Sequence, residues 1–232
     1  MGIAVSTATD IAKNSASCIL VKPGLVDILD VVRVSREVYQ RIRTWALNKI
    51  IKSFEIALLI VIGFMLTKNV ILTPLLGVLF LFANDFVTIA LATDRAEAES
   101  APAKWSLKKL IFSAVSMSII MLVILSISLF IARSFLHFNY SELSTLAFVL
   151  LVLQGQASLY SLRSWPHFWR VRPSKTLFTS TIAVIIIIVI VALSGVIIHS
   201  VPINATWFFV LVPLVSLFST DLIKRFLPIR DH

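Results

Sequence analysis

Residues 77–94, GVLFLFANDFVTIALATD, place Asn84 and Asp85 within a run that is long and apolar enough to cross a bilayer. The preceding run, KSFEIALLIVIGFML at residues 52–66, carries a second acid, Glu55. A carboxylate at the bilayer centre costs about 2.5–3.5 kcal/mol even on the lenient insertion scale, so it is retained where it faces protein or water. The two acids are therefore candidate ion-binding residues.

The composition is that of an integral membrane protein. Of the 232 residues, 58% are hydrophobic and 14% are charged, and the charges lie mainly between apolar runs. A helix of about 20 apolar residues spans the hydrocarbon, where lipid offers no partner for open backbone groups. The predicted fold class is an all-α membrane bundle with a small amino-terminal α/β piece. Six spans are expected, at roughly 45–67, 70–92, 108–132, 144–163, 176–198 and 205–226.

Lys and Arg residues cluster on alternate sides of these spans. They gather before the first span, in the 93–107 and 164–175 loops and in the tail, whereas the other loops carry only Lys68 and Arg133. Because basic residues favour the cytoplasmic side, we expect both termini to be cytoplasmic. These helix ends also account for the net charge of +9, and no basic stripe with interleaved aromatics indicates a nucleic-acid partner.

Residues 1–44 predict a short α/β piece followed by a long amphipathic helix. Residues 3–5 and 18–21 are strand-like, a small-residue helix lies between them, and Pro23-Gly24 is typical of a turn. Two short strands cannot bury a core alone, so we expect this piece to be the end of something larger.

Three segments resemble the P-type cation-transporting ATPases, most closely the bacterial and archaeal relatives of plasma-membrane proton pumps. MGIAVSTATDIAKNSASCILVKPGLVDILDVVRVSREVYQRI, at residues 1–42, resembles the end of the HAD-like phosphorylation domain and the stalk that leads into the fifth membrane helix. FANDFVTIALATDRAEAESAPAKWSL, at residues 82–107, resembles the sixth helix and the loop after it. HFWRVRPSKTLF, at residues 167–178, resembles the eighth-to-ninth loop.

The resemblance implies a division of the chain into three parts. Residues 1–44 would be the end of the phosphorylation domain with its stalk helix, residues 45–226 a domain of membrane helices five to ten, and residues 227–232 a cytoplasmic tail. A multi-pass protein of the plasma membrane is the implied location.

The sequence lacks the motifs with which this family uses ATP. The family's DKTGT, TGE and GDGxND motifs do not occur, and the resemblance does not extend to the nucleotide-binding domain, the actuator domain or the first four helices. The implied function is the membrane portion of an ATP-driven cation pump, with the proton favoured, which hydrolyses no ATP alone and binds no cofactor itself. ATP and Mg²⁺ are expected for the complete pump, and the missing ATPase portion is a candidate partner. The alternative is a non-catalytic truncated or accessory membrane protein that associates with a complete pump.

The resemblance also carries roles to single residues. Asn84-Asp85 matches the sixth-helix Asn-Asp of the proton pumps, so Asp85 is the implied proton carrier, although it could instead cap a broken helix or bond a neighbouring one. Glu55 stands where plant-type proton pumps hold an arginine, while calcium pumps place a glutamate in this region. The alternative for Glu55 is an in-helix pair with Lys52 at the i, i+3 spacing.

Two glutamines add weaker candidates. Gln154 and Gln156 interrupt the fourth predicted span, in the helix where calcium-pump relatives place an acidic ligand. Neutral amides can help to coordinate an ion, but interhelical hydrogen bonding is the alternative. Lys49 and Lys52 are expected to extend to the inner head groups. No metal site is predicted, because Cys18 and the four scattered histidines lack metal-ligand spacing.

Helix geometry predicts that the two acids share one layer of the membrane. Glu55 lies about 15 Å beyond Trp45, and Asp85 lies about 13 Å before Asp94, at about 1.5 Å per residue. If the two helices are adjacent and antiparallel, these distances bring the acids to similar depth.

Overall fold

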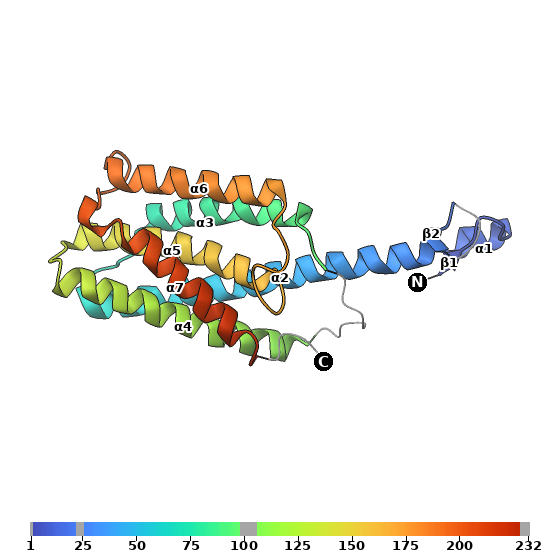
Figure 1. Cartoon of the computed structure of the whole chain (residues 1–232), viewed down its shortest axis with the longest axis horizontal. Helices are drawn as coiled ribbons and strands as arrows, with labels where there is room; N and C mark the ends of the chain where they lie inside the picture. Colours follow the sequence, from blue (N-terminus) through green and yellow to red (C-terminus); the bar gives the residue numbers. More distant parts are fainter. Residues whose placement is uncertain (1, 22–25, 98–105, 228–232) are drawn as a thin grey trace.

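Six long helices pack side by side, and the first of them extends out of the bundle to a small α/β piece (Figure 1). The computed structural model describes residues 2–21, 26–97 and 106–227. In chain order the elements are β1 (Ile3–Ala4), α1 (Asp10–Ser15), β2 (Cys18–Ile19), α2 (Val26–Thr67), α3 (Pro74–Ala90), the 3-10 helix η1 (Leu91–Thr93), α4 (Leu107–Ser134), α5 (Tyr140–Leu162), α6 (Lys175–Ser194), the 3-10 helix η2 (Ile203–Ala205) and α7 (Phe208–Ile223).

The helix α2 is longer than a membrane is thick. Its 42 residues extend about 63 Å at 1.5 Å per residue, about twice the thickness of a hydrocarbon layer. One half therefore packs in the bundle while the other projects from it, with Leu29 largely exposed (Figure 1). The predicted domain boundary at residue 44 falls inside this continuous helix and stays a prediction.

Within the described residues, six helices are long and apolar enough to cross a membrane, which confirms the expected all-α membrane fold. These candidate spans are Asp27–Thr67, Pro74–Thr93, Leu107–Ser134, Tyr140–Leu162, Lys175–Ser194 and Ile203–Ile223. The second begins at Pro74 rather than residue 70, because the Thr73 side chain accepts from the Leu76 backbone N–H at 3.4 Å and caps the helix. The chain is a multi-pass membrane protein.

The centre of the bundle is α5, which packs against α2, α3, α4, α6 and α7. Nearly all of its side chains are buried, including Phe148 and Leu150 at 0% exposure. A helix enclosed by other helices directs its polar side chains at protein rather than lipid. The two candidate glutamines therefore point into the bundle.

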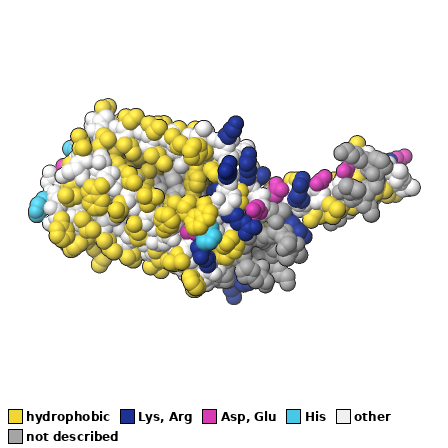
Figure 2. All heavy atoms as spheres, in the orientation of Figure 1, with side chains coloured by type: hydrophobic (Ala, Val, Ile, Leu, Met, Phe, Trp, Pro, Cys, Tyr) yellow, Lys and Arg dark blue, Asp and Glu magenta, His cyan; other side chains and the backbone are white. Residues whose placement is uncertain are grey.

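The face of the bundle seen in Figure 2 is largely apolar, and basic side chains gather at the end from which α2 projects. Large hydrophobic side chains are exposed along the lipid-facing helices, for example Phe82, Ile127 and Val210. This distribution suits a hydrocarbon layer bounded on one side by head groups.

The small α/β piece forms as expected. Strands β1 and β2 pair in parallel, with Ile3 opposite Cys18 and Ala4 opposite Ile19. A parallel pair needs a crossover, which α1 supplies. The turn predicted at Pro23-Gly24 lies outside the described residues.

Candidate ion-binding site

Glu55 lies in the interior of the bundle on α2. Its side chain is fully buried, and neither carboxyl oxygen has a hydrogen-bond partner among the described residues. Lys52, one turn earlier, donates instead to the Asn84 side-chain oxygen on α3 at 2.5 Å. The hydrogen-bonded in-helix pair between Glu55 and Lys52 is therefore absent from the described structure. A buried polar group without a partner requires an explanation, such as a bound water or ion.

Asp85 follows Asn84 directly but faces the outer surface of the bundle. The Asp85 side chain is 51% exposed and forms an ion pair with Lys49 of α2, whereas Asn84 is 2% exposed. Successive helical residues point about 100° apart, so one faces the core and the other does not. No hydrogen bond or ion pair joins Glu55 to Asp85 in the described residues. The two acids thus occupy different surroundings.

The expectation for Lys52 is wrong, because this side chain does not extend to the head groups. It is 4% exposed and held between helices by Asn84. Lys49 likewise turns to Asp85 across the helix interface. The sequence did contain a signal for these contacts, because both lysines lie within or beside an apolar run. An ionisable residue in such a run usually has a partner in the protein.

Gly155 on α5 makes room for this arrangement. A methyl group placed there would lie 2.8 Å from Lys52 Cε and 2.9 Å from Asn84 Oδ1. Both distances are shorter than van der Waals contact, so a side chain at this position would force Lys52 or Asn84 to shift. The sequence analysis did not predict this close approach.

The two glutamines both bond to neighbouring helices. Gln154 Nε2 donates to Ser216 Oγ at 2.7 Å and to the Met121 carbonyl at 3.2 Å. Gln156 Nε2 donates to Asn84 Oδ1 at 3.4 Å. Their amide oxygens are buried and have no partner within the described residues. Interhelical bonding therefore occurs and leaves acceptor oxygens free.

Four buried side-chain oxygens thus have no partner within the described residues, two from Glu55 on α2 and one each from Gln154 and Gln156, which bond to different neighbours of α5. Carboxyl and amide oxygens are the ligands that hard cations prefer, and they also accept from water or hydronium. Within residues 2–21, 26–97 and 106–227, no cluster of three or more His, Cys, Asp or Glu side chains could hold a metal ion.

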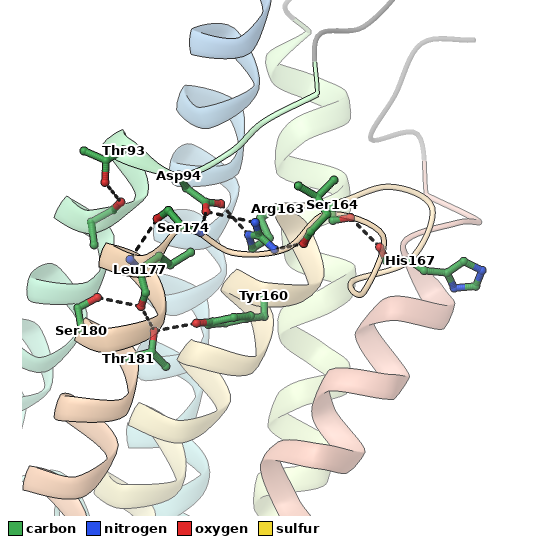
Figure 3. A network of polar contacts seen from close by, with 12 residues as sticks. Thr93, Asp94, Tyr160, Arg163, Ser164, His167, Ser174, Leu177, Ser180 and Thr181 are labelled. Atoms are coloured by element: carbon green, nitrogen blue, oxygen red, sulfur yellow. Dashed lines mark hydrogen bonds and ion pairs between the residues drawn. The ribbon is translucent and has the colours of Figure 1, made fainter.

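The end of the bundle where α2 leaves it, its inner end, holds a buried network of charged and polar side chains (Figure 3). Asp94, just after η1, accepts from Arg163 Nε at 2.7 Å, from Arg163 Nη2 at 3.2 Å and from the Ser174 backbone N–H at 2.8 Å. Arg163 Nη1 donates to the Val171 carbonyl at 2.7 Å. This Asp94–Arg163 clasp is buried and joins the ends of α3, α5 and α6.

A second buried pair fixes the end of α7. Asp221 lies 2.5 Å from Lys224 and accepts from the Phe168 backbone N–H at 2.9 Å. Lys224 also donates to the carbonyls of Ser161 and Ser164 at 2.6 and 2.8 Å. Asp221 is therefore a member of a buried ion pair at the end of α7.

Comparisons with known proteins support the family resemblance. Over 84% of its length the chain is 29% identical to a putative cation-transporting ATPase of Methanocaldococcus jannaschii, and over 84% it is 28% identical to plasma membrane ATPase 1 of Saccharomyces cerevisiae. A plasma membrane ATPase of Neurospora crassa is 25% identical over 75% of the chain. No family model matches the sequence.

These matches confirm the resemblance to P-type cation-transporting ATPases. The chain spans between 19% and 24% of the length of these relatives.

Proposed function

We propose that this chain forms the membrane portion of an ATP-driven cation pump of the plasma membrane, with the proton as the favoured ion. The observation that supports the proposal is that ionisable side chains within the predicted membrane spans are only partly paired. Glu55 is buried in the bundle without a hydrogen-bond partner in the described structure. The Lys49–Asp85 ion pair is partly exposed on the outer face. Such groups are costly in a membrane and usually mark an ion pathway.

The two acids take different roles in this proposal. Asp85 takes up and releases the ion, because its surroundings can change when another segment moves against the outer face. A carboxyl group suits this task, since nearby charge and solvation decide whether it holds a proton. Lys49 supplies the countercharge. Glu55, with the amide oxygens of Gln154 and Gln156, sets the preference for the ion from inside the bundle.

The exposed ion pair also indicates that another protein segment packs against this face. Lys49 and Asp85 are 34% and 51% exposed on a face that would otherwise meet hydrocarbon. Lipid cannot solvate a charged pair, so a further protein segment covers this face in the working pump. We assign this role to the first four membrane helices of the pump, which would accompany its ATP-hydrolysing part in the same or a separate polypeptide. ATP and Mg²⁺ belong to that part, because the chain holds none of the family's motifs for them.

Both termini are cytoplasmic in this proposal. The support is the gathering of basic side chains at the end of the bundle from which α2 projects (Figure 2). The α/β piece lies beyond that end, where the phosphorylation domain would be.

Reconstitution in proteoliposomes tests the proposal. The chain alone is expected to take no phosphate from radiolabelled ATP and to move no ions. Combined with a P-type ATPase portion that supplies the cytoplasmic domains and the first four helices, it is expected to give ATP-dependent cation transport, read with a pH-sensitive dye. A hydroxylamine-labile phosphoprotein formed by the chain alone, or transport that does not need the chain, would contradict the proposal.

The second candidate is an accessory protein that binds a complete pump. The exposed Lys49–Asp85 pair is the observation behind it, because an intact pump could also supply the protein neighbour that this pair needs. The same reconstitution separates the two, since an accessory protein would bind an intact pump and could not replace its helices.

A further inference from the structure

A shallow apolar groove lies along the outer face of α7. Its volume is about 720 Å³, and exposed side chains such as Leu211, Val215 and Phe218 line it. Leu222 continues this exposed face toward the inner end of the bundle. From Leu211 to Leu222 the face extends about 17 Å at about 1.5 Å per residue, which is close to the thickness of one hydrocarbon leaflet. The face therefore has the length of a lipid acyl chain.

Two aromatic side chains from the loop before α6 lie at the inner end of this face. The Phe168 ring meets Phe218 edge-on, with 5.7 Å between the ring centres, and Trp169 meets Phe168 edge-on at 4.8 Å. Trp169 also stacks on the His167 ring at 4.3 Å and is 58% exposed. An exposed ring with a polar N–H is typical of the boundary between hydrocarbon and head groups. The loop thus places Trp169 where the groove meets the head groups.

Arg225, three residues after Leu222, brings a positive charge to this place. Its Nη2 lies 2.7 Å from His167 Nδ1 and 3.7 Å from the nearest Asp221 oxygen. Asp221 is buried and already balanced by Lys224, which lies 2.5 Å away. Arg225 is partly exposed, and its side chain makes no other hydrogen bond or ion pair in the described part of the chain. The Arg225 charge is therefore left over in this group.

Hydrogen-bond donors without acceptors surround this charge. Because Nδ1 of His167 faces the Arg225 guanidinium, which can only donate, the neutral His167 ring carries its proton on Nε2. Neither this N–H nor the Trp169 indole N–H has an acceptor among the described residues. Figure 3 shows the His167 ring pointing away from the buried network. Donors grouped around a guanidinium are suited to hold a phosphate.

We propose that the groove on α7 binds an acidic phospholipid from the leaflet at the inner end of the bundle. Its acyl chain lies along the groove, and its phosphate accepts hydrogen bonds from Arg225, His167 and Trp169. The leftover charge favours a head group with a net negative charge over a zwitterionic one. The apolar face favours a lipid over a free phosphate ion, which could not use it. Binding of the lipid does not depend on the proposed transport function.

Photolabelling of the full chain in phosphatidylcholine vesicles tests the site. The probe is a phosphatidylglycerol with a diazirine in its acyl chain, and its control is the phosphatidylcholine with the same acyl chain. We expect the acidic probe to label α7 peptides about fivefold more, the preference typical of one basic residue for acidic lipid. Arg225→Gln should remove this preference and leave labelling by phosphatidylcholine unchanged, because Asp221 keeps its pair with Lys224. Lys175→Gln, which removes an exposed cation at the start of α6, is the matched control and should keep the preference.

A second pair of variants locates the acyl chain. Val215→Trp fills the groove and should reduce labelling of α7 by both probes severalfold, whereas Ile186→Trp, exposed on α6, should not change it. Equal labelling by the two probes, a preference that survives Arg225→Gln, or labelling unchanged by Val215→Trp would overturn the proposal. An equal loss of preference in Lys175→Gln would overturn it too, because the basic end would then attract acidic lipids without a site. Loss of the preference on addition of inorganic phosphate at constant ionic strength would assign the donors to a free phosphate instead and would also overturn it.

Discussion

The inner end of the bundle and its middle treat buried polar groups in opposite ways. At the inner end, Asp94 accepts three hydrogen bonds, and Arg163 is bonded through three of its nitrogens. In the middle, Glu55 is equally buried but has no hydrogen-bond partner in the described structure. A fully satisfied network holds helices together, whereas a partly satisfied one needs something further. The difference shows that the charges at the inner end hold helices together through hydrogen bonds, whereas the Glu55 carboxylate makes no such bond within the described residues.

The largest effect on stability is expected at the Asp94–Arg163 clasp. Asp94→Asn removes the charge that compensates buried Arg163 and should lower the free energy of unfolding by about 3–5 kcal/mol. Asp30→Asn is the matched control, because its pair with Arg33 is 3.4 Å long and largely exposed, and it should cost less than about 1 kcal/mol. Unfolding in mixed detergent micelles, followed by helical circular dichroism, measures both. If both variants lowered the free energy of unfolding equally, the buried Asp94–Arg163 pair would contribute no more to stability than an exposed pair.

A smaller loss is expected from Gly155→Ala. The added methyl group meets Lys52 and Asn84 at less than 3.0 Å, and overpacking of this kind costs about 1–3 kcal/mol. Gly77→Ala on α3 is the control, since nothing lies within 4 Å of its added methyl group. It should be neutral or stabilise the helix by about 0.5–1 kcal/mol. The same unfolding assay applies, and a neutral Gly155→Ala would show that Lys52 does not need this close approach.

Glu55→Gln is expected to change stability least of the buried substitutions. It is the counterpart of Asp94→Asn, but no hydrogen bond is lost, so the free energy of unfolding should change by less than about 1 kcal/mol. A loss of several kcal/mol would mean that Glu55 has a structural partner after all.

Cysteine labelling tests on which side of the membrane each end of the bundle lies. In a Cys18→Ser background, Glu97→Cys and Phe135→Cys place thiols near opposite ends of the spans. An impermeant reagent added outside intact cells should label residue 135, and residue 97 only after the membrane is opened. Labelling of both from the same side would refute the topology.

Hydropathy predicted the fold because membrane helices follow from the length of apolar runs. The strands at residues 3–4 and 18–19 and the six spans emerged from this local signal. Periodicity could not show which way Asn84 and Asp85 face, because that depends on how α3 packs against α2 and α5. The sequence also did not predict that Lys52 bonds to Asn84. The two side chains meet beside Gly155, which lies about 100 residues from Lys52 on another helix.

The most direct test of the central claim compares ATP-driven transport by two variants of the assembled pump in proteoliposomes. Asp85→Asn keeps the size of the side chain and its hydrogen bonding but removes the titratable charge, so it should abolish transport while the protein still inserts. Glu55→Gln should retain transport with a shifted apparent affinity for the ion. Transport at the wild-type rate by Asp85→Asn would contradict the account and leave both acids as structural residues.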